Sequence, residues 1–370
     1  MLGADVAALA RMGRAALSRR VEYVILFVTA RCNLLCQHCF YIEEIKKSKS
    51  KRELTLDEYG KIATNLGSVL QVSLTGGEPF LRKDLGEIIR VFHRNAGAMA
   101  FNVTTNGLLR PRIVQTLEEI FDGDPSLSLR LGVSLDGFEE VHDRTRGKDG
   151  GFKEVVLTLQ ALKPLRERYR GLTVHISTTL TRDNAPAIRE FVDFVATLDV
   201  DAHYLGYIRG NVTLDPGLKN VSLEDYRAAT EYMKHRWVSR AKYQNLLNVV
   251  TVLKDTVTSR ILERDEYFFP CVAGKKMLTI DEEGLVKPCE MLEQMGISPY
   301  VMGDLRAHDY DVYRVLASDA ARRIRDRIVD EKCYCTFECA NIANVSLSPV
   351  NFVKAGALYS AQALRRTVTR

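Results

Sequence analysis

The chain has 370 residues, of which 46% are apolar and 27% are charged, with a net charge of +5. This composition is ordinary for a globular protein, and a mild charge on so long a chain predicts no nucleic-acid partner. No apolar run reaches the about 18 residues that a membrane span requires, and Arg11 and Arg14 interrupt any secretory signal core. We therefore expect a cytoplasmic protein whose thiols stay reduced.

Both ends of the chain are expected to form basic amphipathic helices, over residues 1–21 and 346–370. At the N-terminus one face would carry Leu2, Val6, Leu9, Ala16 and Leu17. At the C-terminus one face would carry Val353, Ala357, Leu358, Ala361 and Leu364. Packing on the rest of the protein is the interpretation we favour. The alternative is peripheral contact with the anionic inner surface of a membrane, which would fit a lipid-linked substrate.

Three cysteines directly follow the first predicted strand, residues 22–29, which is a short apolar run. They are Cys32, Cys36 and Cys39, and no further cysteine occurs before Cys271. A disulfide framework or scattered buried cysteines would not produce such clustering in a large reduced protein. Thiolates are good ligands for zinc and for iron–sulfur clusters, so the pattern indicates a metal site.

Predicted strands and helices alternate from residue 55 onward. Thr55 is expected to cap the first helix, with Glu58 completing a capping box. Further strands are expected at residues 71–75, 100–105, 127–135, 172–180 and 201–207, and the helices that follow them at 84–95, 111–121, 152–169 and 185–198. Six strand–helix units predict an α/β fold with an open, partial (β/α)6 TIM barrel over residues 22–215, because eight units close a full barrel.

The pattern changes after residue 215. Residues 216–265 are expected to form a helical connector, and residues 266–345 a small turn-rich domain that contains five cysteines. Within it, the sequence from Met277 to Cys289 predicts a β-hairpin whose turn lies at residues 281–284. Such a hairpin would return Cys289 to the neighbourhood of Cys271.

The spacing Cys32-X3-Cys36-X2-Cys39 after a buried strand resembles the signature of the radical S-adenosylmethionine (SAM) superfamily. The resemblance implies a [4Fe-4S] cluster on these thiolates, with one iron left open to chelate SAM. An electron from an external donor such as flavodoxin or ferredoxin would then release a 5′-deoxyadenosyl radical, which abstracts a hydrogen atom from the substrate. The alternative is a zinc loop that distant cysteines complete.

Further motifs agree with this resemblance and imply a set of cofactor-binding residues. "LTGGEPFL" places Gly76, Gly77, Glu78 and Pro79 after the second strand and looks like the family's GGE motif, which binds the SAM amino group. Thr105 and Asn106 end the third strand and Ser134 the fourth, where α/β folds bind ligands. Arg146 is a candidate partner for the SAM carboxylate. The other members of the set are His38, in the place of an aromatic residue near adenine, and Phe40.

Each of these residues also has a plainer interpretation. The glycines could form an ordinary turn, Arg146 could be a solvated loop arginine, and Asp136 is expected to cap a turn rather than contact a ligand. Thr178, Thr179, Tyr207 and Arg209 are weaker candidates for the same mouth of the barrel.

The second cysteine group resembles a SPASM/twitch domain, a module that binds auxiliary clusters behind radical SAM cores. The resemblance is carried by Cys271-X12-Gly284-X4-Cys289. It implies one auxiliary [4Fe-4S] cluster on Cys271, Cys289 and Cys339, with Cys333 or Cys335 as the fourth ligand. Glu290 matches an acidic residue that acts as a base in anaerobic sulfatase maturases. The alternative to the auxiliary cluster is a zinc knuckle, and the alternative for Glu290 is an ordinary surface glutamate.

The resemblance therefore implies a radical SAM oxidoreductase that acts on a small-molecule, lipid-linked or peptide substrate. A peptide maturase of the kind that modifies ribosomally made (RiPP) peptides is an alternative, although the first 22 residues are too few for a leader-binding region. The alternative from another class is a zinc-stabilised α/β binding protein without turnover. The outcome for the substrate stays open among dehydrogenation, cross-linking, epimerisation and addition.

Overall fold

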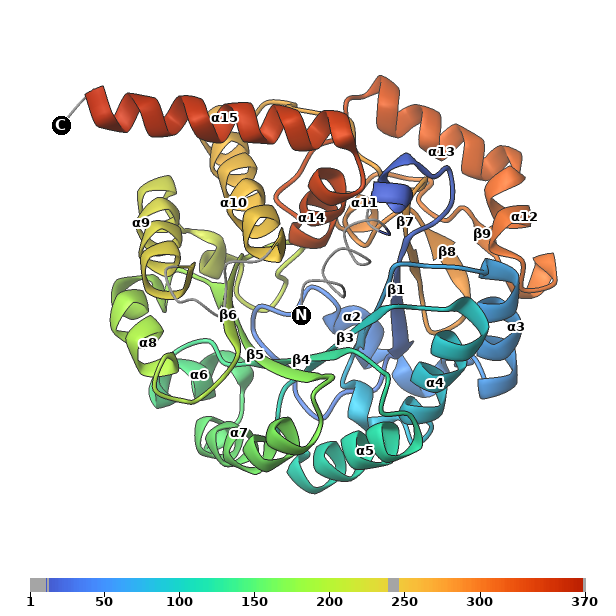
Figure 1. Ribbon diagram of the computed structural model, residues 1–370, viewed down its shortest axis with the longest axis horizontal. Helices are drawn as coiled ribbons and strands as arrows, with labels where there is room; N and C mark the ends of the chain where they lie inside the picture. The colour runs from blue at the N-terminus through green and yellow to red at the C-terminus, as the bar shows by residue number, and fades with distance from the viewer. Residues whose placement is uncertain (1–10, 12, 239–245, 369–370) are drawn as a thin grey trace.

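A computed structural model describes residues 11, 13–238 and 246–368 of the chain (Figure 1). Its strands are β1 (Tyr23–Thr29), β2 (Gln71–Gly76), β3 (Ala100–Thr105), β4 (Leu129–Ser134), β5 (Leu172–Leu180), β6 (Ala202–Tyr207), β7 (Met277–Ile280), β8 (Leu285–Lys287) and β9 (Gly303–Asp304). All six strands expected in the first half of the chain are present, and their bounds lie within two residues of the predicted ones.

The strands form one sheet in the order β6-β5-β4-β3-β2-β1-β7-β8-β9. Strands β1 to β6 are parallel to their neighbours and curve into an open arc, so the predicted partial barrel is confirmed (Figure 1). The register pairs Thr29, at the end of β1, with Gly76, at the end of β2. Parallel strands bring their carboxyl ends to one edge, which places the three-cysteine loop beside the glycine motif.

Helices cover the outside of the arc (Figure 1). They are α3 (Leu56–Leu66), α4 (Leu85–Ala96), α5 (Arg110–Gly123), α6 (Glu139–Arg146), α7 (Gly151–Arg168) and α8 (Ile188–Val195), whereas α2 (Ile42–Lys46) lies inside the arc in this view. The capping box at the start of α3 is present as predicted, because Thr55 and Glu58 exchange side-chain and backbone hydrogen bonds. The apolar faces of the outer helices pack on the outward side chains of the strands, such as Val72, Leu131 and Ile176, in one continuous core.

The C-terminal part of the chain extends the same sheet. β7 pairs in parallel with β1, and the predicted hairpin of β7 and β8 is confirmed, with Asp281 and Gly284 in its turn. The expected separation of a core, residues 22–215, from a domain at 266–345 stays a prediction, since one sheet runs through both. The remaining helices are α9 (Leu223–Met233), α10 (Leu246–Arg264), α11 (Met291–Gln294), α12 (Val312–Ala317), α13 (Asp319–Asp330), α14 (Glu338–Ser346) and α15 (Pro349–Val368).

Helix α13 corrects the expectation of a short, turn-rich segment. It spans twelve residues and buries Ala321, Ile324 and Ile328 at helical spacing. The charged residues between these positions obscure the pattern in the sequence. Helices α10, α14 and α15 pack together through a second apolar cluster that includes Val257, Phe269 and Ala355. These helices lie across the open side of the arc (Figure 1).

The two predicted terminal helices are described unequally. Leu2, Val6 and Leu9 lie outside the described residues, and so do the side chains of Ala361 and Leu364, whereas α15 is present as a helix. Its first turns expose Phe352 and Val353 beside Lys354. Among the residues described, no helix combines the length and apolar character needed to span a bilayer. Peripheral membrane contact stays a prediction.

Candidate cluster and cofactor site

The three-cysteine loop lies over the carboxyl ends of the strands. Cys32, Cys36 and Cys39 all line a cavity of about 380 Å³ inside the arc. The loop is fixed by backbone hydrogen bonds, including Gln37 N to Thr145 O at 2.8 Å. The sequence thus brings three thiols to one wall of one cavity, as predicted.

These thiols are reduced and mostly buried. Burial raises the pKa of Cys32 to about 12 and that of Cys39 to about 11, and it raises the pKa of Cys36 although Arg146 opposes the shift. The thiolate is the form that binds metal, and a bound metal ion favours loss of the thiol proton because it supplies positive charge. This donor set therefore fits an iron–sulfur cluster. In the described part of the chain, no three His, Cys, Asp or Glu side chains are grouped closely enough to hold a single metal ion.

The glycines of the GGE motif serve the packing of the cysteine loop. Gly76 has φ of 120°, and a Cβ there would lie 2.3 Å from the carbonyl oxygen of Thr29. A Cβ on Gly77 would lie 2.1 Å from the carbonyl oxygen of Arg31. Only glycine permits so close an approach, which the hydrogen bond from Gly77 N to Thr29 O (2.8 Å) completes. The motif that is expected to bind the SAM amino group therefore also fixes the position of the cysteine loop.

Glu78 is the centre of a buried hydrogen-bond network in this cavity. Its Oε1 accepts from the backbone N–H of Phe80 (3.1 Å) and from Thr105 Oγ1 (2.9 Å), and its Oε2 accepts from Asn106 N (2.8 Å). The Asn106 side chain donates in turn to Asn33 Oδ1 in the cysteine loop (2.7 Å). Burial raises the pKa of Glu78 to about 7, although these donors favour the carboxylate. The network couples β2, β3 and the cysteine loop.

Arg146 is held differently from the prediction. Its Nε and Nη2 bind Asp136 Oδ2 at 2.7 and 2.6 Å, and its Nη1 lies 3.8 Å from Cys36 Sγ. Asp136 is fully buried and also accepts from Thr179 N at 2.9 Å, so it holds this arginine rather than capping a turn. Burial opposes ionisation of Asp136, but the charge of Arg146 has the opposite effect and prevails, so the pKa of Asp136 is lowered to about 2. Asp136 thus holds the Nε and Nη2 groups of the guanidinium, and the role of Arg146 as a partner for the SAM carboxylate stays a prediction.

Most of the predicted cofactor residues share this cavity. Its walls include Gly76, Gly77, Glu78, Thr105, Asn106, Ser134, Arg146, His38 and Phe40. His38 is half-buried, and its buried Nδ1 has no hydrogen-bond partner among the described residues. Burial lowers its pKa to about 4, so the ring is neutral near pH 7. Pro79 does not line the cavity, because it begins a short 3-10 helix, Pro79–Leu81, that is buried behind Glu78.

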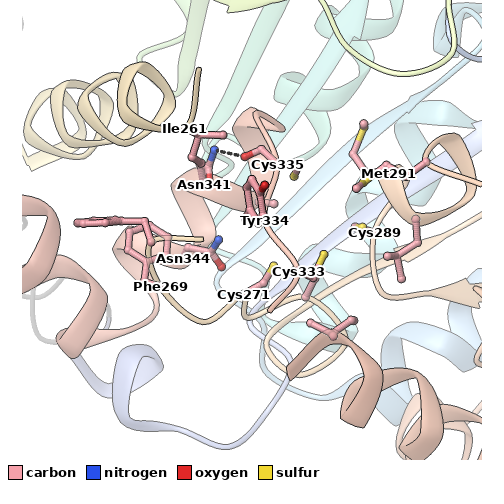
Figure 2. A pocket seen from close by; sticks show the side chains of 16 residues that line it. Ile261, Phe269, Cys271, Cys289, Met291, Cys333, Tyr334, Cys335, Asn341 and Asn344 are labelled. Carbon is pink, nitrogen blue, oxygen red and sulfur yellow. Dashed lines mark hydrogen bonds between the residues drawn. The ribbon is translucent and has the colours of Figure 1, made fainter. Parts of the chain in front are cut away.

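Four thiols of the second group converge on another cavity (Figure 2). Cys271, Cys289, Cys333 and Cys335 line a space of about 20 Å³. Burial, together with neighbouring thiols, raises the pKa of Cys333 and of Cys335 to about 12. Helix α14 holds two of the three cysteine segments, since Asn344 Oδ1 accepts from Val272 N (2.7 Å) and Asn341 Nδ2 donates to Cys335 O (3.0 Å). Four soft ligands from separate segments fit a metal cluster.

Cys339 lies apart from this group, contrary to its predicted place among the ligands. It lines the larger cavity instead, with the Tyr23 hydroxyl as hydrogen-bond partner. The reason is the start of α14 at Glu338, which turns residue 339 toward the interior of the arc while Cys335 stays in the preceding loop. Both Cys333 and Cys335 therefore take positions that the sequence assigned to one of them.

Glu290 is buried and ion-paired. Its Oε1 accepts from Arg209 Nε (3.2 Å) and Nη2 (3.1 Å), and it lines neither the larger cavity nor the four-cysteine one. Burial raises its pKa, although Arg209 opposes this. Arg209 lines the larger cavity and also an outer groove of about 500 Å³ that Cys333 and Cys335 share. The role of Glu290 as a base stays a prediction.

The sequence reasoning missed several polar residues of the larger cavity. They come from the amino-terminal halves of the strands and from α10 and α14, and they include Arg130, His175, Tyr204, Lys254 and Glu338. A signal was available, because polar residues alternate with apolar ones at the start of strands such as β2 and β4.

Comparison with known proteins finds a family that part of the chain matches. Residues 26–201 match the Radical SAM superfamily. GTP 3′,8-cyclase of Alkaliphilus oremlandii is 35% identical over 137 residues, which are 36% of this chain and 41% of that protein. The antilisterial bacteriocin subtilosin biosynthesis protein AlbA of Bacillus subtilis is 25% identical over 326 residues, 83% of this chain and 65% of AlbA. The chain thus spans less than two thirds of each of these relatives.

Similarity to a solved structure agrees on the fold. Streptococcus suis SuiB, in a crystal structure bound to S-adenosylmethionine, superposes with a TM-score of 0.59 at 19% identity, over 86% of this chain and 71% of SuiB. Members of the matched family are enzymes that use a [4Fe-4S] cluster and SAM. Residues 26–201 of this chain thus form a Radical SAM domain.

Proposed function

We propose that this enzyme is a radical SAM oxidoreductase with one auxiliary [4Fe-4S] cluster. The observation that carries the proposal is the presence of two sets of thiols. The three of the first loop line the cavity of Glu78, which Cys339 also lines, and four others surround the cavity of Figure 2. When bound, the first cluster and SAM supply a radical that removes a hydrogen atom from the substrate, and a second cluster supplies an electron acceptor. Arg209 lines the first cavity and the groove beside the second set.

Different residues of the first cavity would hold the first cluster and SAM. Cys32, Cys36 and Cys39 would ligate the cluster and leave one iron without a protein ligand. Glu78 Oε1 already accepts two hydrogen bonds, whereas Oε2 accepts one. A carboxylate oxygen has two lone-pair sites, so Oε2 keeps one acceptor site for the SAM ammonium group. Arg146, fixed by Asp136, would place positive charge beside the Cys36 thiolate.

The four thiols of the second set would ligate the auxiliary cluster. Asn341 and Asn344 hold the segments on either side, so the ligands come from a fixed frame rather than a free loop. The cavity shares Cys333, Cys335 and Met291 with the outer groove, which puts the second set near a surface that a substrate or an electron donor can reach.

Anaerobic purification tests the proposal directly. The protein should be brown, contain about eight irons for two four-iron clusters, and form 5′-deoxyadenosine from SAM with dithionite. Cys36→Ala should abolish 5′-deoxyadenosine formation while about four irons remain. A colourless protein that holds zinc instead would support the binding-protein alternative. Reduced flavodoxin or ferredoxin in place of dithionite tests the external donor.

A peptide is the second candidate substrate. It is supported by the outer groove of about 500 Å³, which reaches the cofactor cavity at Ile208 and Arg209, and by the similarity to AlbA over 83% of this chain. An extended chain in this groove could direct one residue past Arg209. A peptide panel incubated with SAM and dithionite, and read by mass spectrometry for products that have lost hydrogen, tests it. Formation of 5′-deoxyadenosine without any altered peptide would count against a peptide substrate.

A further inference from the structure

The interior of the arc is lined with polar side chains. Barrels of this kind are ordinarily filled by bulky apolar residues. Here the side chains that face the cavity are polar on every strand from β2 to β5, for example Gln71, Asn102, Arg130 and His175. The alternate residues, such as Val72, Phe101 and Leu131, face the helices and are buried. An interior built in this way leaves room and hydrogen-bonding groups for a ligand.

Arg130 lies at the end of this interior remote from the cysteine loop. It is four residues before Ser134 on β4, a separation of about 13 Å at the rise of a strand. Ser134 belongs to the carboxyl end of the sheet, where Glu78 and the three thiols lie. The cavity therefore has a second, deep end that the proposed cofactor residues do not reach.

The charge of Arg130 is not balanced at this end. Its hydrogen-bond partner in the described part of the chain is the neutral Gln71, whose Oε1 accepts from Arg130 Nη2 at 2.9 Å. Within that part, no carboxylate forms an ion pair with Arg130. The nearby His175 is neutral, because burial and the charge of Arg130 lower its pKa to about 3. Tyr204 is neutral as well, since burial raises its pKa.

The lysine of the opposite wall has its own counter-ions. Lys254 of α10 pairs with Glu338 of α14 at 2.9 Å and with Asp255. Two glycines make room for side chains of the cavity: a Cβ on Gly132 would lie 2.7 Å from His175 Nε2, and one on Gly206 would lie 2.6 Å from Glu338 Oε2. The deep end is thus a polar chamber that Arg130 lines without an ion-pair partner among the described residues.

We propose that this deep end binds an anionic group of the substrate, a carboxylate or a phosphate, with Arg130 as its principal donor. A guanidinium recognises either group through paired N–H donors. His175, Tyr204 and Asn102 surround it with neutral hydrogen-bonding groups. The inference rests on the proposed function, since the substrate must extend from this anchor to the cofactor end.

Equilibrium dialysis of the full-length, cluster-loaded enzyme with saturating SAM tests the inference. SAM occupies the cofactor end, so added anions report on other sites. The probes are succinate, inorganic phosphate and the uncharged succinamide. Wild type should bind succinate or phosphate and not succinamide, and Arg130→Gln should weaken this binding at least about tenfold, which corresponds to about 1.4 kcal/mol. Arg130→Lys, which keeps the charge, should recover part of the affinity.

The matched control is Arg170→Gln, which removes an exposed arginine outside the cavity and should bind the anions as wild type does. Melting temperatures verify that each variant folds. Tighter binding of succinate than of phosphate assigns a carboxylate, and the reverse assigns a phosphate. The inference is overturned if wild type binds neither anion, or if Arg130→Gln binds as tightly as wild type. Failure of wild type to form 5′-deoxyadenosine would instead overturn the proposed function.

Discussion

Arg209 and Glu290 form an ion pair between the two cysteine sites, with Nη2 and Oε1 3.1 Å apart. The guanidinium also lies over the rings of Phe40 (5.3 Å) and Phe337 (4.9 Å). Phe40 adjoins the first cysteine loop, and Phe337 lies between Cys335 and α14. One arginine therefore joins the loop of the first site to the segment that carries the second.

Loss of the Glu290 charge should destabilise the protein. Glu290→Gln leaves a largely buried guanidinium without its counter-ion, and we expect the free energy of unfolding to fall by about 2–3 kcal/mol. Urea denaturation of the anaerobic protein measures this. The double variant Arg209→Met with Glu290→Gln should recover part of the loss, because no charge is then left unpaired. Equal stability of Glu290→Gln and wild type would show that the pair contributes nothing.

The iron content of cysteine variants should separate Cys339 from the four thiols of Figure 2. Cys333→Ala and Cys335→Ala should each lose the auxiliary cluster and keep about four irons, whereas Cys339→Ala should keep about eight. The physical reason is position, since Cys339 lines the larger cavity and the other two line the smaller one. Iron and sulfide analysis with electron paramagnetic resonance measures the outcome. Loss of the cluster in Cys339→Ala would restore the ligand set expected from the sequence.

The sequence predicted well what depends on local pattern. Strand β3 has the predicted bounds of residues 100–105, because turn residues and helices delimit an alternating segment. The three-cysteine loop and the hairpin were likewise predictable, since their spacing is short. The contact of Gly77 with Arg31 was not, although the parallel register of β1 and β2 would have implied it. The glycine motif was recognisable in the sequence, but the backbone contact that requires glycine at each position was not.

Contacts between segments that are distant in the chain could not be predicted from the sequence. Cys335 and Cys339 are four residues apart, yet the start of α14 sends them to different cavities. The ion pair of Arg146 and Asp136 joins the ends of a strand and a helix, and a solvated arginine was an equally good interpretation. Such cases depend on how elements pack, and a single sequence does not encode packing in any local spacing.

The pair of Glu58 and Arg306 should make stability depend on pH. Arg306 of the C-terminal part binds Glu58 at the start of α3 through two hydrogen bonds of 2.7 and 3.1 Å. The hydrogen bond from Arg306 lowers the pKa of Glu58 to about 2 in the folded protein. Because the folded pKa is below the ordinary value of about 4.3, the pair stabilises the fold above that pH and loses this effect as the pH falls toward 2.

Urea unfolding at several pH values measures this contribution. Glu58→Gln should be less stable than wild type by about 1–2 kcal/mol at pH 7, and the difference should shrink between about pH 5 and pH 2. Glu167→Gln, which changes an exposed glutamate with no ion pair in the described part of the chain, should show no such trend. A difference that stays constant down to pH 3 would mean that Arg306 does not hold the carboxylate.

Two glycine-to-alanine substitutions should act in opposite directions. Gly77→Ala places a Cβ 2.1 Å from a backbone oxygen of Arg31, which cannot rotate away, so the cysteine loop must move. We expect a loss of about 3 kcal/mol or more, with selective loss of the first cluster and retention of the auxiliary one. Gly60→Ala, within α3 and with no atom within 4 Å of the new Cβ, should gain about 0.5–1 kcal/mol. Retention of about eight irons by Gly77→Ala would contradict the close packing of the motif on the loop.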